Sequence, residues 1–297
     1  MLPTEVIFVY YVLVFVLGTF IGSFLNLISD RVLTGETFVR GRSHCDHCKK
    51  TLEPKNLVPV LSFLIQGGKC DKCKTKLSWY YPASEMLTGV LFIYAAFLST
   101  IFLSPTPKNL VSFLFLIGVF CFFTIMLLTD AKEFIIPDKV VFAAIAFVMV
   151  FLILTYSFDI VSLYLKFSHD SFGAYLIKSG YWTSQVFAVL KAFGLIIMSS
   201  FAIAGFFLFL VLITRGRGMG AGDIKLGFLL GLVNGFPLNI IAIFLGFVLG
   251  AVYSLFLIVF RKTTIKDTIA FGPFLILGSL ICLLYGSIIL NWYIHLL

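Results

Sequence analysis

The sequence predicts an all-α polytopic membrane protein with about eight transmembrane helices. Of its 297 residues, 60% are hydrophobic and 12% are charged, and the mean hydropathy of +1.07 is far above that of water-soluble domains. Apolar stretches of about 20 residues, the length that crosses a bilayer as a helix, recur along the chain. Helices satisfy their own backbone hydrogen bonds in lipid, so the composition excludes a soluble domain and favours helical spans.

We expect these spans to be separated by polar loops and, between the fourth and fifth, by a less apolar linker at residues 157–188. Residues 1–9 hold no basic segment, and the first apolar run, Val6 to Ile28, is long enough to cross the bilayer. It is therefore expected to remain as a helix rather than to be removed as a signal peptide. The expected spans are residues 5–28, 82–103, 109–129, 138–156, 189–213, 223–236, 238–260 and 270–293.

One polar segment, residues 29–81, interrupts this pattern between the first two spans. It contains ten Lys or Arg residues, two close pairs of cysteines and a Gly67-Gly68 turn signal. Its composition predicts a small domain outside the membrane. The chain is thus expected to comprise a first helix (1–28), this small domain (29–81) and a seven-helix membrane domain (82–297).

The positions of the basic residues predict the orientation of the chain. With the spans above, one set of loops holds 18 Lys or Arg residues and the opposite set holds four. Basic loops are retained in the cytoplasm, so the cysteine-bearing domain is expected there, with both termini outside. The net charge of +8 is then explained by the orientation of the chain in the membrane and by contact with lipid headgroups, and we expect no nucleic-acid partner.

The cysteine pairs Cys45/Cys48 and Cys70/Cys73 predict a structural zinc site. Each pair has Cys-x2-Cys spacing, and 21 residues separate the two, as in ribbons that bind one tetrahedral zinc through four thiolates. A segment with few large apolar residues also needs such a metal for stability. Two disulfides are disfavoured in the cytoplasm, and a redox pair lacks its βαβ context. Cys121 and Cys282, inside apolar runs, are expected to pack in the core.

Two aspartates mark a candidate catalytic site. Asp130 ends the third span and Asp223 opens the sixth, both at the expected cytoplasmic side, so two carboxylates from distant positions are able to meet at one depth. Two carboxyl groups about 3 Å apart do not both ionise, so one acts as base and the other as acid. This pair suits aspartyl proteolysis, in which one carboxyl deprotonates a water and the other bonds the scissile carbonyl oxygen.

Glycines beside Asp223 support this hypothesis. Gly216, Gly218, Gly220 and Gly222 permit positive φ and the close approach of an extended peptide. The alternative is that each aspartate is an interfacial anchor or a helix cap. For Asp138, which follows Pro137, a role in capping the helix explains its position better than a catalytic role does.

These residues together resemble a known family. GMGAGDIKL at 218–226, the Asp130-x6-Pro137-Asp138 run, GSFLNLISDR at 22–31 and the cysteine pairs are similar, in order, to the type IV prepilin peptidases, membrane aspartyl proteases of the GxGD class. The resemblance implies that Asp130 and Asp223 are the catalytic dyad, with Gly218, Gly220, Gly222, Lys225, Pro137 and Asp138 as supporting motif positions. It also implies leader peptides of prepilins and pseudopilins as substrates, and the bacterial cytoplasmic membrane as the location.

The resemblance implies a second activity as well. In this family the cysteine-bearing region accompanies N-methylation of the new amino terminus by S-adenosylmethionine, and Lys76 and Glu85 match positions usual in the family, although a topogenic lysine and an interfacial carboxylate explain them equally well. The chain departs from the family pattern at two places. The usual Pro-x-Ser-x-Cys-Pro-x-Cys begins here with Gly41, and the usual Arg-Tyr-Pro is Tyr80-Tyr81-Pro82.

Two other classes of function remain open at this point. A proton-coupled carrier would use the same aspartates as a relay, although such relays favour discontinuous helices at the midplane. A zinc-bearing assembly protein of the pilus or secretion apparatus would need no catalysis. The lipid bilayer is the one partner that all three functions share.

Overall fold

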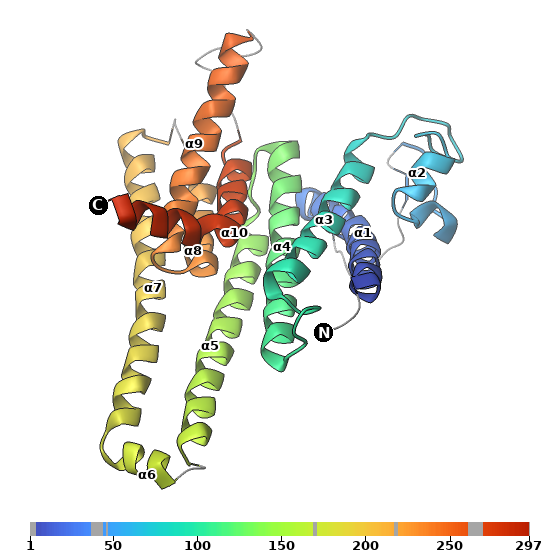
Figure 1. Ribbon diagram of the computed structural model, residues 1–297. Helices are drawn as coiled ribbons and strands as arrows, with labels where there is room; N and C mark the ends of the chain where they lie inside the picture. The colour runs from blue at the N-terminus through green and yellow to red at the C-terminus, as the bar shows by residue number, and fades with distance from the viewer. Residues whose placement is uncertain are drawn as a thin grey trace. The chain divides into compact units, whose positions relative to one another are not determined.

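The structure is a computed structural model that describes residues 4–36, 44–45, 47–168, 171–216, 219–260 and 270–296. These residues form helices, turns and two isolated β-bridges, and they contain no β-strand. The chain divides into two compact units, residues 1–140 and 141–297, and each is described by itself (Figure 1). The expected all-α membrane fold is confirmed, since seven of the described helices are long and apolar enough to cross a bilayer.

The first unit combines three long helices with a small domain inserted between the first two. The apolar sequence of each long helix is uninterrupted by proline beyond its first turn, which allows it to continue for a full span. The short elements of the inserted domain lie between Pro54 and Ile65. The elements are α1 (Thr4–Thr34), η1 (Pro54–Leu57), α2 (Leu61–Ile65), α3 (Tyr80–Ser99) and α4 (Pro107–Glu133).

Small residues bring α1 and α3 into close contact. A Cβ added to Gly18 would lie 2.8 Å from the Gly89 Cα, and one added to Gly22 would lie 2.9 Å from the Glu85 Cα. Gly18 and Gly22 have the Gly-x3-Gly spacing with which membrane helices approach one another. This crossing places Glu85 of α3 directly against α1.

The second unit contains most of α5 and all the later helices. Of the eight expected spans, 223–236 is the one without a full-length helix, because α8 has 14 residues, fewer than the about 20 that cross a bilayer. The helices are α5 (Asp138–Ser168), α6 (Ser171–Lys178), α7 (Tyr181–Ile213), α8 (Ala221–Asn234), α9 (Leu238–Val259) and α10 (Gly272–Leu296).

Helices α5 and α7 are longer than the sequence suggested. Most of the stretch 157–188, expected as a less apolar linker, belongs to their ends and to α6, at the bottom of Figure 1. Aromatic pairs join the two helices along this extension, with ring centres 5.3 Å apart for Tyr156 and Phe193 and 5.7 Å for Tyr164 and Trp182. These contacts explain why the helices continue through a segment of mixed polarity.

Polar side chains hold the turn between α8 and α9. The Asn234 side-chain amide donates to the Ser279 hydroxyl of α10, and that of Asn239 donates to the Ser199 hydroxyl of α7, both over 2.7 Å. Interhelical hydrogen bonds of this kind stabilise helix packing where water is excluded. They fix the length of α8, whose first turn carries Asp223.

We expect Gly22→Val to destabilise the first unit. The added side chain overpacks the α1–α3 contact, so the free energy of unfolding should fall by about 1–3 kcal/mol. Thermal unfolding of the detergent-solubilised protein measures the change. Gly205→Ala in α7, where a Cβ meets nothing within 4 Å, is the control, and equal melting temperatures for the two variants would contradict the close crossing.

Candidate functional site: a cysteine cluster, a polar cavity and two buried aspartates

The four paired cysteines form one cluster in the inserted domain. The sulfur atoms of Cys45, Cys48, Cys70 and Cys73 all lie within 4.8 Å of one another, and those of Cys45 and Cys73 are 3.9 Å apart. Four sulfurs at about 2.3 Å from a tetrahedral zinc are about 3.8 Å apart, so the donor set fits this metal. Hydrogen bonds from the side chain and backbone of Thr75 lower the pKa of the Cys73 thiol to about 6, which favours the thiolate that a metal requires.

The cluster is built from two copies of one backbone motif. Lys49 N–H donates to the Cys45 carbonyl, and Lys74 N–H donates to the Cys70 carbonyl, with each lysine at positive φ (55° and 59°). The isolated bridges His44–Thr51 and Lys69–Lys76 close the two motifs in the same way. Sequence analysis missed this internal repeat, although its signal, a Lys directly after each Cys-x2-Cys, is present in the chain.

A polar cavity of about 500 Å³ lies between the cysteine cluster and the adjoining ends of α1 and α3. Lys76 and Glu85, the two candidate residues for methyl transfer, both line it, so the structure brings them to one site. Asp30 and Arg31 of α1 and Tyr81 of α3 line it as well. The volume is that of a small-molecule site with charged groups of both signs.

Glu85 connects the membrane helices to the inserted domain. Its carboxylate accepts the Val60 backbone N–H over 2.7 Å, and its side chain also hydrogen-bonds that of Ser23. Val60 has φ of 59° and ψ of −50°, and the Leu61 N–H donates to the Pro59 carbonyl across it. This is a γ-turn with positive φ, strained for a β-branched residue, and the bond to Glu85 helps to hold it.

Asp130 lies near the end of α4, which is tied to α1 and α3. The Asp130 side chain is buried. The Tyr80 hydroxyl donates to the Leu128 carbonyl over 3.2 Å, and Lys132 forms an ion pair with Asp30 and lies 4.3 Å from the centre of the Tyr80 ring. Tyr80 occupies the place of the family's Arg, and here it contacts a cation from another helix.

Asp223 is buried at the start of α8. It is the third residue of the helix, and its carboxylate accepts the Gly220 backbone N–H over 3.1 Å, as a side chain in the first turn of a helix does. Helices α8 and α9 form a hairpin, and at 1.5 Å per residue their 14 and 22 residues span about 21 and 33 Å. Helix α8, whose first turn carries Asp223, is therefore about 12 Å shorter than α9, and Figure 1 shows α9 continuing beyond α8.

The supporting residues have separate places in the two units. Pro137 and Asp138 start α5, where the Val140 N–H donates to the Pro137 carbonyl. Lys225 of α8 lies 5.4 Å from the centre of the Phe142 ring. Of the glycines, Gly216 has positive φ (72°), Gly220 is extended, Gly222 lies in α8, and Gly218 lies outside the described residues. Asp130 and Asp223 belong to different units, so their pairing stays a prediction.

Comparison with known proteins places this site in a family. The model of the bacterial peptidase A24 N-terminal domain matches residues 16–99, and that of the type IV leader peptidase family matches residues 173–255. The chain belongs to the type IV leader peptidase family. The first match contains the cysteine cluster, Lys76 and Glu85, and the second contains Asp223, whereas Asp130 lies between the two.

Curated relatives match nearly the whole chain. A protein of Bacillus subtilis is 29% identical over 96% of this chain and 98% of its own length, and one of Pseudomonas aeruginosa is 26% identical over 94% and 91%. A protein of Myxococcus xanthus is 42% identical over 27% of this chain and 24% of its own. All three are named prepilin leader peptidase/N-methyltransferase. No solved structure matches the chain.

We expect Cys45→Ser to release the metal from the cysteine cluster. Loss of one of four thiolates weakens tetrahedral zinc binding, so metal content should fall well below one zinc per chain and the loop around residues 44–79 should become sensitive to protease. Elemental analysis of the purified protein measures the ratio. Cys121→Ser, in α4, is the control with normal metal content, and an unchanged ratio in Cys45→Ser would contradict the four-thiolate site.

Proposed function

We propose that the protein is a membrane-embedded aspartyl endopeptidase that removes the leader peptides of type IV prepilins and pseudopilins, and that it then methylates the new amino terminus. The observation that carries the proposal is the buried Asp223 in the first turn of a helix too short to cross the bilayer, within the segment matched by the type IV leader peptidase family. Membership of a peptidase family disfavours the carrier and the non-catalytic assembly protein.

Peptide hydrolysis requires a base and an acid on either side of the scissile bond. In the proposed mechanism Asp130 and Asp223 share one proton, and the ionised member takes a proton from the attacking water. The protonated member donates a hydrogen bond to the carbonyl oxygen as charge develops on it. The Gly220 N–H holds the Asp223 carboxylate in one orientation, which limits the motion that would misdirect the water.

The chemistry also suits the site of cleavage. Because α8 is about 12 Å shorter than α9 and too short to cross the bilayer, we expect Asp223 to meet a scissile bond near the membrane surface. The excess of basic residues on the same side supports a cytoplasmic active site in a bacterial inner membrane. We place the cysteine domain on this side as well, with zinc as its structural metal.

Methyl transfer is proposed for the cavity beside the cysteine cluster. S-adenosylmethionine supplies an electrophilic methyl group when it is bound. Its charges fit the lining, since Lys76 offers a cation for a carboxylate, and Asp30 and Glu85 offer anions for an amino group or sulfonium. Glu85, already tied to Val60, is placed to orient the amine that accepts the methyl group.

Asp223→Asn should abolish leader removal, with a loss of about 100- to 10,000-fold or more, because the amide neither accepts nor supplies the catalytic proton. Asp130→Asn should have the same effect. The assay follows the mass of a purified prepilin incubated with each variant in detergent. Both variants should still bind zinc and methylate a pilin from which the leader has already been removed.

Asp159→Asn, a carboxylate of α5 outside the motifs, is the control and should cleave normally. Either dyad variant with near-normal cleavage would remove that residue from the catalytic pair. Loss of both activities together with loss of zinc would indicate a folding defect, not a catalytic role.

The Glu85 variants should separate charge from positioning in methylation. Glu85→Gln keeps an oxygen for the Val60 N–H but loses the charge, whereas Glu85→Ala loses both. If the carboxylate charge acts on the acceptor amine, both variants should reduce methylation of cleaved pilin by about tenfold or more while leader removal continues. Full activity of Glu85→Gln with loss in Glu85→Ala would instead limit Glu85 to a structural role.

A further inference from the structure

The short helix α2 presents an apolar face that the described residues of the first unit leave uncovered. Leu61, Leu64 and Ile65 stand at positions i, i+3 and i+4, so they share one side of the helix. The Ile65 side chain is 84% exposed, and Leu61 and Leu64 are each more than half exposed. Trp79, directly before α3, is 70% exposed beside them. Apolar groups gathered in this way on a small domain mark a contact surface.

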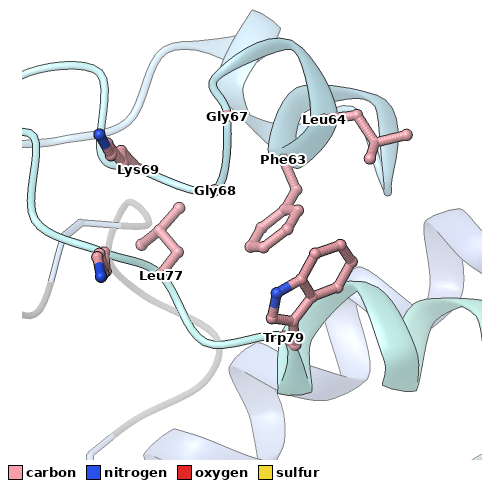
Figure 2. A pocket seen from close by; sticks show the side chains of 8 residues that line it. Phe63, Leu64, Gly67, Gly68, Lys69, Leu77 and Trp79 are labelled. Atoms are coloured by element: carbon pink, nitrogen blue, oxygen red, sulfur yellow. The ribbon is translucent and has the colours of Figure 1, made fainter.

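The face is held in a fixed shape. Phe63, the one buried residue of α2, packs against Trp79 with ring centres 4.8 Å apart, and Gly68 lies against the Phe63 ring. Figure 2 shows Phe63 and Trp79 facing one another in the lining of a cavity that Leu64 also lines. This cavity measures about 380 Å³ and is open to the outside, and its remaining lining includes Leu77 and two lysines. We call the exposed side chains of Leu61, Leu64, Ile65 and Trp79, with this cavity, the α2 face.

The charge beside the α2 face is positive, and no described carboxylate pairs with its two lysines. Lys69 and Lys76 are the two residues of an isolated antiparallel bridge, and like charges in such a pair repel one another. Across the described part of the chain, no carboxylate lies within 4.0 Å of either lysine, whereas Lys55, Lys72 and Lys74 do have carboxylate partners. Residues 44–79 hold seven lysines and three acidic residues. An anion bound at Lys69 would relieve the repulsion.

The position of the α2 face indicates what binds to it. Trp79 is adjacent to Tyr80, the first residue of a helix that crosses the bilayer, so the face lies at the membrane boundary. Tryptophan is enriched at that boundary, and lysines beside apolar groups bind anionic headgroups there. We propose that the α2 face is a docking surface for anionic phospholipid, with headgroup phosphate at Lys69 and acyl carbons against α2 and Trp79. This proposal rests on the bilayer and not on either enzymatic activity.

The test places a fluorescent reporter on the α2 face of the full-length protein. In a background of Trp79→Phe, Trp182→Phe and Trp292→Phe, a single tryptophan is introduced by Ile65→Trp. The protein is reconstituted in nanodiscs of phosphatidylcholine with and without phosphatidylglycerol, and with lipids brominated near the headgroup. Lys50→Trp, at an exposed residue of the same domain outside α2, is the matched reporter.

The proposal predicts that the Ile65→Trp reporter emits at shorter wavelength in nanodiscs that contain phosphatidylglycerol and is quenched by the brominated lipid, whereas the Lys50→Trp reporter is not. Adding Lys69→Gln should weaken the dependence on phosphatidylglycerol. Lys55→Gln, which removes a lysine already paired with Glu53, should leave it unchanged.

Two results would overturn the proposal. The first is water-like, unquenched emission from Ile65→Trp in every nanodisc. The second is a blue shift that appears in detergent and grows with protein concentration, which would assign the α2 face to a second copy of the chain. Leader removal and methylation need not be measured, so failure of this inference is distinct from failure of the proposed function.

Discussion

The first unit depends on the close crossing of α1 and α3, where Gly18 and Gly22 leave no room for side chains between the backbones. Helices in a bilayer gain little from hydrophobic association, because lipid tails are as apolar as leucine, so tight packing has to hold them together. The crossing sets Glu85 against Gly22 and within hydrogen-bonding reach of Ser23. A packing contact between two small residues thus fixes the place of a carboxylate that lines the polar cavity.

Because Glu85 also accepts a hydrogen bond from Val60, the helix crossing positions part of the inserted domain as well. The Val60 turn would be strained alone, but its N–H bonds to a carboxylate held by the membrane helices, and α2 begins directly after it. The cysteine cluster ties the other part of the domain together through two matching turns. A segment too poor in apolar residues to build its own core is therefore held by the cysteine cluster at one end and by a membrane helix at the other.

Local patterns in the sequence predicted the helices and the cysteine cluster, because apolar runs and Cys-x2-Cys spacing act over short distances along the chain. The cavity that joins Lys76 to Glu85 was beyond such reasoning, since it depends on how α1, α3 and the inserted domain pack. The length of α5 and α7 was missed for the same reason: aromatic contacts between them, such as Tyr164 with Trp182, override a mixed local composition. The pairing of Asp130 with Asp223 remains a prediction from sequence.

In the proposed mechanism, Asp223 needs access to water and also has to reach a bond near the membrane, and the short helix α8 allows both. An aspartate in the middle of a full span would be costly to ionise and out of reach of water. An aspartate at the surface would not reach a bond near the membrane. In the proposed mechanism, the start of α8, a helix about 12 Å shorter than α9, keeps Asp223 between these extremes, in a first turn whose free N–H groups favour negative charge. The bonds from Asn234 and Asn239 to α10 and α7 anchor the other end of α8, so the depth of Asp223 follows from contacts at the opposite side of the helix.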